Sequence, residues 1–479
     1  MSNNRGEQPT LKKRCEMSAE VLAVLRSKRR EDALNAVRLE SINLMSCNEE
    51  ELPSIETMIE TTQKAIHGDI SSLKLLQTFF SSKCFVYNNL IMKYQWCATL
   101  LNSPFNSNNE YAHYVVLFLA SYTQSNHHEY SKDLVTAKIG DYFSFYFSKG
   151  GEIARALLWC VSNVSSEGTL LAEYFLNAGI VHYALEYYKT NPVNNQTIVC
   201  WLFSNIFITR VLYNLEIIRE IFMFLVSSLN STNVETVKYS LWGISYLAET
   251  TSYEELVLSK ELINKVIELV QSKYEIIVLP AMKFIGALST KSDRVSFILI
   301  NCGIYEVLQK VIITNLQNER IQQVVYWSIS NMIGTSDVSL AYPLFTNTQI
   351  PQMIYETMKS VDNPPALEKE LQYLLVNLVF NKDDLYLQLV ISKIPGIGQL
   401  LVETLSKDPR QTLVNMLVIG IYNILMFYIN QNVMPSDVID MTSLVTALHK
   451  YEHETFLSER VRLFIRMILD SIEESSVIE

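Results

Sequence analysis

The sequence predicts an all-α solenoid, in which units of two or three helices repeat along the chain. Three observations support this. From residue 64 onward the apolar residues recur at helical spacing, without convincing runs of alternating strand residues. The chain has only 14 glycines and 12 prolines, and its hydrophobic fraction is 49%, as expected for stacked helices with short connections. An aromatic position recurs about every 42 residues, a period typical of helical repeats.

The recurring position is an aromatic residue followed four residues later by a side-chain amide, so that both lie on one helix face. Trp159 and Asn163 in RALLWCVSNVSSEG are the first clear pair. The same pair recurs as Trp201/Asn205 and Trp327/Asn331, with the variants Trp242/Tyr246 and Tyr373/Asn377. When the repeats are aligned on the aromatic position, successive repeats have Phe118, Trp159, Trp201, Trp242, Lys283, Trp327, Tyr373 and Ile419. These residues are 41, 42, 41, 41, 44, 46 and 46 residues apart.

Two smaller features also recur in the repeat. Asn177-Ala-Gly179-Ile180 and Asn301-Cys-Gly303-Ile304 predict the same glycine turn between a short helix and a longer one. Pro395-Gly396-Ile397 resembles this turn.

A ladder of aromatic rings and amides suits an extended peptide ligand. Neighbouring helices lie about 8–10 Å apart and an extended chain advances about 3.3 Å per residue, so each repeat meets two or three ligand residues. Apolar slots between rings fit the stem and charged head of Lys or Arg. An Asn can donate to a ligand carbonyl and accept from a ligand N–H. A single Trp is more often a core residue, but repetition with an amide favours a binding surface.

Charge divides the chain into a basic arm and an acidic body. Residues 1–48 hold nine Lys/Arg and six Asp/Glu, a net charge of +3. Because the whole chain has a net charge of −11, residues 49–479 carry −14. An acidic body argues against direct nucleic-acid binding and for a partner rich in Lys and Arg. We expect an arm at 1–48, an acidic linker leading into the first repeat at 49–63, and the solenoid at 64–479. Besides Arg5, the cations of the arm are Lys12, Lys13, Arg14, Arg26, Lys28, Arg29, Arg30 and Arg38.

The arm has three interpretations. Arg26, Lys28, Arg29 and Arg30 are spread around a predicted helix that lacks an adequate apolar face. The helix is then a solvated arm, a segment wrapped by an acidic partner, or a nuclear targeting patch.

Other sequence features exclude several classes of protein. The seven cysteines are scattered singly and no signal peptide is recognisable, which fits a reducing compartment. Gln411 to Ser436 is uncharged and long enough to cross a membrane, but it carries Asn415 and Asn423 and follows the repeat period, which favours a buried repeat helix. His449 and His453 lack a third metal ligand. With no catalytic or phosphate-binding motif, we expect no enzyme, cofactor, metal site or membrane attachment.

A family resemblance is carried, in chain order, by the segments LRSKRREDALNAV, ELPSIETMIE, LWGISYLAE, AMKFIGAL and YWSISNMIG. Through these segments the chain resembles the importin-α (karyopherin-α) family of nuclear import adaptors. The resemblance implies a right-handed superhelical armadillo-repeat solenoid of about ten repeats. It implies binding of basic nuclear localisation signals of cargo proteins, an importin-β-type carrier bound by the arm, an export receptor for recycling, and a location in cytoplasm and nucleus. The alternative is a cytoplasmic armadillo scaffold that binds other peptides or protein complexes.

The resemblance assigns residues to two ligand grooves. The major groove comprises Phe118, Tyr122, Trp159, Asn163, Glu167, Trp201, Asn205, Trp242 and Tyr246. The minor groove comprises Lys283, Trp327, Asn331, Glu370, Tyr373 and Asn377.

The chain departs from the family pattern at several positions. Phe118/Tyr122 replaces Trp/Asn, Lys283/Ala287 replaces Arg/Asn, and Val324 stands where an acidic residue is expected. In the arm only Arg38 remains of a second basic cluster, which predicts weak self-inhibition.

Overall fold

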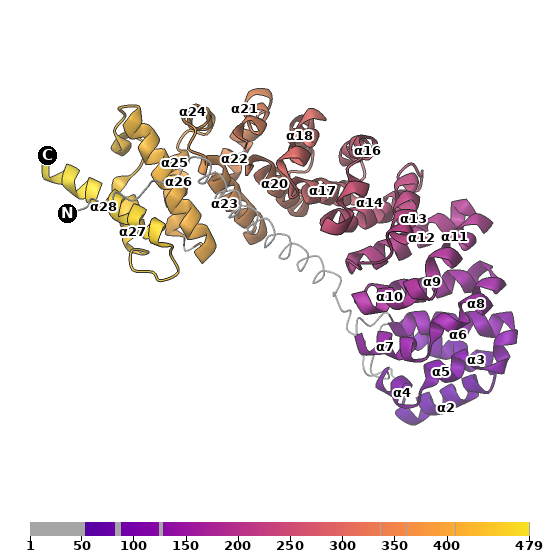
Figure 1. Ribbon diagram of the computed structural model, residues 1–479. Helices are drawn as coiled ribbons and strands as arrows, with labels where there is room; N and C mark the ends of the chain where they lie inside the picture. Colours follow the sequence, from indigo (N-terminus) through magenta and orange to yellow (C-terminus); the bar gives the residue numbers. More distant parts are fainter. Residues whose placement is uncertain are drawn as a thin grey trace, which may run out of the picture. The chain divides into compact units, whose positions relative to one another are not determined.

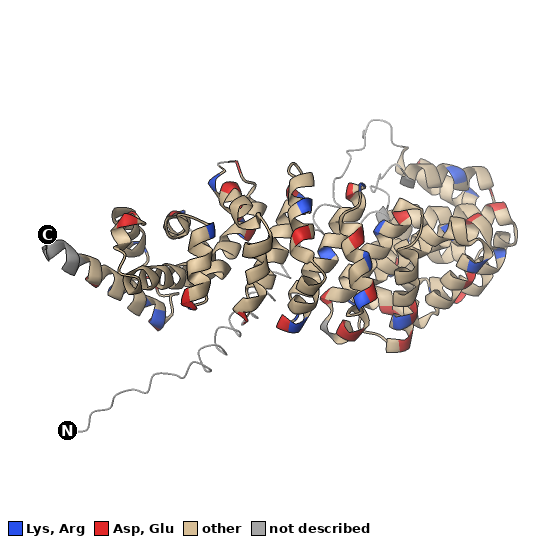
Figure 2. Ribbon diagram, turned by 90° about the horizontal axis from the view of Figure 1, so that it is seen from above, with Lys and Arg blue, Asp and Glu red and all other residues tan. Residues whose placement is uncertain are grey.

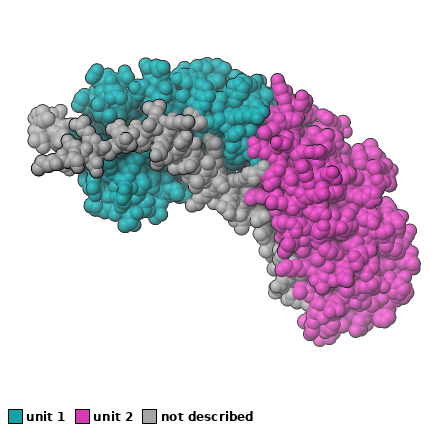
Figure 3. Space-filling model, viewed as in Figure 1, with its two compact units in different colours: residues 1–33, 266–273, 285–479 teal, residues 34–265, 274–284 magenta. Residues whose placement is uncertain are grey.

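The computed structural model describes residues 53–81, 88–123, 128–335, 337–360, 362–407 and 409–478. Every regular element in these ranges is a helix, which confirms the predicted all-α class (Figure 1). The chain divides into two compact units (Figure 3). Among the described residues, unit 2 covers those from 53 to 265 and 274–284, and unit 1 covers 266–273 and those from 285 to 478. The predicted basic arm at 1–48 lies outside the described residues.

The repeats of unit 2 have a long third helix that carries the ladder position. The first helix, α2, begins at Ile55, inside the predicted linker, and packs against α3. The helices of this unit are α2 (Ile55–Ile66), α3 (Ile70–Ser81), α4 (Asn88–Lys93), α5 (Trp96–Leu101), α6 (Asn109–Tyr122), α7 (His128–Thr136), α8 (Phe143–Lys149), α9 (Gly151–Ser165), α10 (Thr169–Asn177), α11 (Ile180–Thr190), α12 (Pro192–Ile208), α13 (Leu215–Ser228), α14 (Val234–Glu249) and α15 (Glu254–Val257).

The repeats of unit 1 each have a first, a second and a long third helix. Two helices, α16 (Lys260–Val270) and α17 (Glu275–Ser289), contribute residues to both units. The remaining helices are α18 (Asp293–Asn301), α19 (Ile304–Thr314), α20 (Glu319–Ile333), α21 (Tyr342–Asn347), α22 (Ile350–Lys359), α23 (Pro365–Val379), α24 (Asp384–Lys393), α25 (Ile397–Ser406), α26 (Gln411–Asn430), α27 (Met441–His449) and α28 (Glu459–Ile478).

The predicted glycine turns between first and second helices are confirmed. Gly179 joins α10 to α11 with φ +80, Gly303 joins α18 to α19 with φ +73, and Gly396 joins α24 to α25 with φ +79. A residue with a Cβ is strained in this left-handed conformation, so glycine permits the sharp change of direction.

Asparagine caps begin many of the third helices. The Asn233 side chain accepts from the backbone N–H groups of Glu235 and Thr236 at the start of α14. Asn108 caps α6 and Asn318 caps α20 by the same kind of bond. Each cap satisfies N–H groups that the helix itself leaves unpaired.

The third helices form the core of each unit because they are buried on several sides. In unit 2, α6 packs on α9, α9 on α12, and α12 on α14. In unit 1, α20 packs on α23, α23 on α26, and α26 on α28. This serial packing places equivalent positions of successive third helices side by side within each unit, and so builds the ladder.

Helix α26 is long and apolar enough to cross a membrane by length and composition alone. It packs against α23, α25 and α28, and 61% of its most apolar 18-residue window is buried within the protein. This packing agrees with the predicted repeat helix.

Candidate peptide-binding surface

Three tryptophans of unit 2 occupy equivalent positions on successive third helices. Trp159 lies on α9, Trp201 on α12 and Trp242 on α14, and all three are half-buried. Their helical neighbours, such as Leu158 and Leu202, are fully buried. The three rings therefore keep part of their surface exposed while the rest of each helix packs into the core.

A slot of about 340 Å³ lies between Trp159 and Trp201. Its apolar wall includes Ala156 of α9 and Ile198 of α12. The slot also has two exposed charged side chains. A slot with aromatic and aliphatic walls fits the stem of a long side chain.

The charged side chains of the slot are Glu152 and Arg155, both on α9. Glu152 supplies a carboxylate for a cationic ligand head, and Arg155 already places a cation there. Charge at this slot is thus mixed rather than purely acidic.

The next step of the ladder also contains a cation of the protein itself. Tyr239 lies beside Trp201 with ring centroids 6.4 Å apart, and Lys238 Nζ is 4.3 Å from the Tyr239 centroid. Lys238 is neutralised by an ion pair with Glu235. Trp242 stacks on Tyr246 at 5.6 Å, so Tyr246 supports a neighbouring ring at the position where the other pairs have Asn.

The asparagines tie each third helix to the one before it. In unit 2, Asn163 Nδ2 donates to Ala120 O at 3.1 Å and Asn205 Nδ2 donates to Ser162 O at 3.1 Å. In unit 1, Asn331 Nδ2 donates to Ser289 Oγ at 3.3 Å. Sequence reasoning assigned these amides to the ligand, and the structure adds a second role, because each amide nitrogen also donates a hydrogen bond to the preceding repeat.

This arrangement leaves the acceptor side of each amide for another partner. Asn331 Oδ1 is buried and has no hydrogen-bond partner among the described residues. A buried carbonyl oxygen without a donor is unfavourable, so a ligand N–H would be welcome there. Asn163 and Asn205 are half-buried, so their amide oxygens can accept hydrogen bonds from a peptide backbone.

The predicted minor-groove residues of unit 1 are more buried than the tryptophans of unit 2. Trp327 is 5% exposed, and its Nε1 has no partner among the described residues. Glu370, Tyr373 and Asn377 are also buried, and all three lie on α23. Lys283 is half-buried and belongs to unit 2, so the structure does not group it with the others within one unit.

Phe118 and Tyr122 require a correction as groove-lining residues. Both are fully buried and their rings stack with centroids 6.5 Å apart. Tyr122 Oη donates to Asp133 Oδ2 at 3.2 Å, a bond to the following helix α7. The physical reason is that the Tyr122 side chain is longer than that of an Asn, so that it extends to α7. Phe118 and Tyr122 therefore pack into the core and leave no exposed aromatic ring.

Acidic residues follow two of the three tryptophan helices. Glu167 is half-buried just after α9, as predicted. Glu249 at the end of α14 is buried and forms an ion pair with Arg210, 3.4 Å from nitrogen to oxygen. Sequence reasoning missed Glu249, although its position seven residues after Trp242 parallels Glu167 eight residues after Trp159. Elsewhere in the described part, acidic and basic residues are interspersed over many helices (Figure 2).

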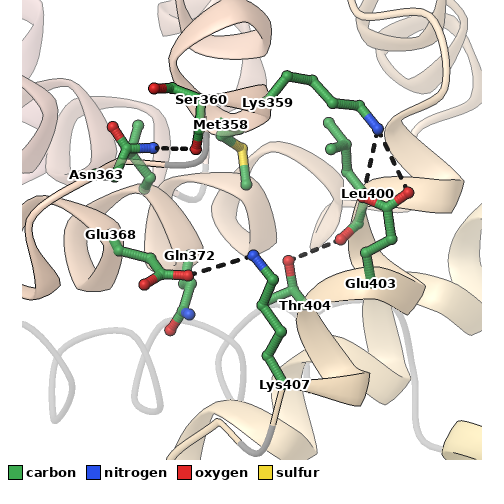
Figure 4. Close-up of a pocket in the computed structure, with 11 residues that line it drawn as sticks. Met358, Lys359, Ser360, Asn363, Glu368, Gln372, Leu400, Glu403, Thr404 and Lys407 are labelled. Carbon is green, nitrogen blue, oxygen red and sulfur yellow. Dashed lines mark hydrogen bonds and ion pairs between the residues drawn. The ribbon is translucent and has the colours of Figure 1, made fainter.

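A second hollow, of about 210 Å³, lies in unit 1 beside the N-terminal end of α23 (Figure 4). Lys359 pairs with Glu403 at 3.3 Å, and Lys407 pairs with Glu368 at 3.5 Å. The charges around it are paired with each other across successive repeats. We interpret these bridges as links between helices, each worth about 0–1 kcal/mol because they are exposed.

Comparisons with known proteins agree with this architecture. No protein-family model matches the chain. A stretch of 181 residues is 21% identical to importin subunit alpha-8 of Arabidopsis thaliana, covering 37% of this chain and 40% of that relative. An engineered protein solved by the Northeast Structural Genomics Consortium covers 86% of this chain and is itself covered to 99%, with 16% identity and a TM-score of 0.71.

A designed armadillo repeat protein is also similar, at 16% identity over 51% of this chain and 97% of its own, with a TM-score of 0.44. The serial packing of the third helices and the similarity over 86% of the chain identify an all-α armadillo-repeat solenoid, a fold whose repeats present equivalent side chains in a row.

Proposed function

We propose that this protein is a non-enzymatic nuclear import adaptor, which binds Lys/Arg-rich localisation signals of cargo proteins along the ladder of unit 2. Its basic arm at residues 1–48 joins the cargo complex to an importin-β-type carrier, and an export receptor returns it to the cytoplasm. The protein then moves between cytoplasm and nucleus. Membrane and nucleic acid have no direct part in this function.

The observation that carries the proposal is the row of half-buried indoles at Trp159, Trp201 and Trp242. Exposed indole faces attract cations, and the slot between the first two holds a long side chain beside the carboxylate of Glu152. The amide ladder adds acceptors for an extended backbone. Glu167 places a carboxylate beyond the first ring, whereas Glu249 beyond the third ring is already paired with Arg210.

The sequence similarity to an importin α supports the nuclear import function over a general peptide scaffold. The basic arm points in the same direction, because a scaffold that only holds peptides has no need of one. The alternative, a cytoplasmic armadillo scaffold for other peptides, is favoured by the mixed charge at Arg155 and Lys238.

The two functions differ in their ligand, which a binding titration can identify. Fluorescence anisotropy of a labelled peptide with five consecutive Lys/Arg residues is measured against the full chain, with an alanine-substituted peptide in parallel. We expect micromolar or tighter binding of the basic peptide only. Trp159→Ala with Trp201→Ala should remove about 1–4 kcal/mol, at about 0.5–2 kcal/mol per cation–π contact.

The matched control is Tyr274→Ala, which removes an aromatic ring that is 45% exposed in unit 2 but is not part of the ladder. It should leave the affinity unchanged. Equal binding of both peptides, or indifference to the tryptophan substitutions, would favour the scaffold instead. Capture of an importin-β-type carrier by the full chain, and its loss on removal of residues 1–48, tests the arm separately.

A further inference from the structure

The amide ladder of unit 1 continues one repeat beyond the predicted residues. Asn423 on α26 lies four residues after Ile419, the last aligned ladder position. Its Nδ2 donates to Val379 O at 3.0 Å and to Phe380 O at 3.2 Å, at the end of α23. Asn423 is 3% exposed, and its Oδ1 has no partner among the described residues. The last ladder step therefore has a buried acceptor aimed away from the two carbonyls that its amide nitrogen contacts.

Beside this amide, two aromatic rings form a closely stacked pair. Tyr422, the neighbour of Asn423, stacks on Phe464 of α28 with centroids 4.1 Å apart and an interplanar angle of 7°. This pair joins the third helices of the last two repeats. Tyr422 lies three residues after Ile419, the residue aligned with the tryptophans of unit 2.

Two cations lie against the stacked pair. Lys382 Nζ is 5.2 Å from the Tyr422 centroid and 5.8 Å from that of Phe464. The Arg460 guanidinium carbon is 5.2 Å from the Phe464 centroid. Cation–π contacts of this kind hold a charged head in place while leaving its N–H groups able to donate.

Two cations lie at this step, whereas the slot between Trp159 and Trp201 has one carboxylate and one cation. Lys382 and Arg460 are both exposed, and Arg460 forms no ion pair with any described residue. Of the nearby carboxylates, Asp383 caps α24 by accepting from Tyr386 N at 2.8 Å. Glu459 precedes Arg460 in the first turn of α28.

We propose that Lys382 and Arg460, held against the stacked rings of Tyr422 and Phe464, form a carboxylate-binding position at the last step of the ladder. The carboxylate comes from a Glu or Asp side chain, or from the C-terminus, of an extended peptide. Arg460 pairs with it through parallel N–H donors and Lys382 adds a point charge. The site does not depend on basic-signal binding in unit 2.

The experiment uses the full chain and fluorescein-labelled Gly/Ser peptides with a central run of three Glu or three Gln. A third peptide lacks acidic side chains but ends in a free carboxylate, and a fourth is its C-terminal amide. Anisotropy titrations at low and moderate salt should show binding of the Glu peptide at least about tenfold tighter than of the Gln peptide. The last two peptides distinguish a side-chain carboxylate from a terminal one.

Lys382→Glu with Arg460→Glu should abolish this preference, and Arg460→Gln alone should weaken it about threefold to tenfold. Lys450→Glu is the matched control, because Lys450 Nζ lies 5.9 Å from the Tyr451 centroid, outside the cluster. It should leave the preference intact. Equal affinity of the wild type for Glu and Gln peptides, including undetectable binding of both, overturns the proposal, as does a preference that survives the double charge reversal in a variant with a native circular dichroism spectrum.

Discussion

The Asn377 side-chain amide lies 2.8 Å from the carbonyl oxygen of Ser330 and 3.0 Å from its hydroxyl oxygen. One side chain on α23 thereby joins the third helices of two successive repeats. The Asn205 amide makes the corresponding bond to Ser162 O in unit 2. Because these amides lie beside the aromatic ladder, the residues that stack the repeats also shape the proposed ligand surface.

Asn377→Ala should therefore lower the stability of unit 1. The substitution leaves a buried carbonyl without its donor, at a cost of about 1–3 kcal/mol. Chemical denaturation followed by circular dichroism measures the loss, and hydrogen exchange should show it first in α20 and α23. Asn230→Ala is the control, since Asn230 is an exposed residue after α13. A change as small as that of the control would show that the amide is dispensable for stacking.

Gly286→Ala should disturb the seat of Trp327. A Cβ at Gly286 would lie 2.3 Å from one carbon of the Trp327 ring and 2.6 Å from another, so the ring must move. Overpacking of this kind costs about 1–3 kcal/mol. Thermal melts of Gly286→Ala, Trp327→Leu and the double variant measure the coupling. The double variant should be less destabilised than the sum of the two, and additivity would mean that the two residues do not interact.

Buried cysteines of unit 2 should resist alkylation. Burial raises the pKa of Cys160 to about 12 and that of Cys200 to about 11, whereas Cys302 of unit 1 is half-buried. Thiolate is the reactive form, so at pH 8 we expect iodoacetamide to modify Cys302 well before the other two. Peptide mapping by mass spectrometry gives the order. Rapid modification of Cys160 in the native protein would contradict its burial.

The same two thiols make a pH-dependent contribution to stability. Their pKa values are raised above the ordinary 9.0, so the unfolded chain releases these protons at lower pH than the folded chain. The contribution is fully present below pH 9 and is lost as pH rises toward 11–12. The free energy of unfolding, measured by denaturation, should be lower at pH 10.5 than at pH 8. This decrease should be smaller in the double variant Cys160→Ala with Cys200→Ala than in the wild type, each chain being compared with its own value at pH 8.

Helix α26 should not insert into membranes. Its surface is occupied by α23, α25 and α28, and the Asn423 amide bonds to the end of α23. Moving α26 into lipid would break these contacts and leave polar groups such as the Asn423 amide without hydrogen-bond partners. In a flotation assay with neutral vesicles, the purified chain should stay at the bottom of the gradient. Comigration with the vesicles would show that α26 leaves its repeat.

Deletion of residues 1–48 should raise cargo affinity less than tenfold. The arm offers only Arg38 where a second basic cluster would compete with cargo. Anisotropy titration of the basic peptide against both chains measures the difference. A gain greater than tenfold would show strong self-inhibition by the arm.

Helical class and repeat period were predictable because they depend on local spacing. Apolar residues at helical intervals, the glycine turns at Gly179 and Gly303, and the ladder of Trp159 and Trp201 all agree with the structure. Glu249 could also have been predicted, because it follows Trp242 by seven residues and Glu167 follows Trp159 by eight. Asn423 was missed because its ladder partner is Ile419 rather than an aromatic residue, although the spacing is the same.

The sequence by itself determined that helices repeat, where they turn and which positions recur on one face, because these properties follow from neighbouring residues. Only the tertiary structure decided which recurring side chains remain exposed. Trp159 keeps an open face, while Phe118 at the equivalent position is fully buried. It also decided that Asn205 donates to the preceding helix, since the acceptor, Ser162 O, lies 43 residues away and meets the amide only when repeats stack.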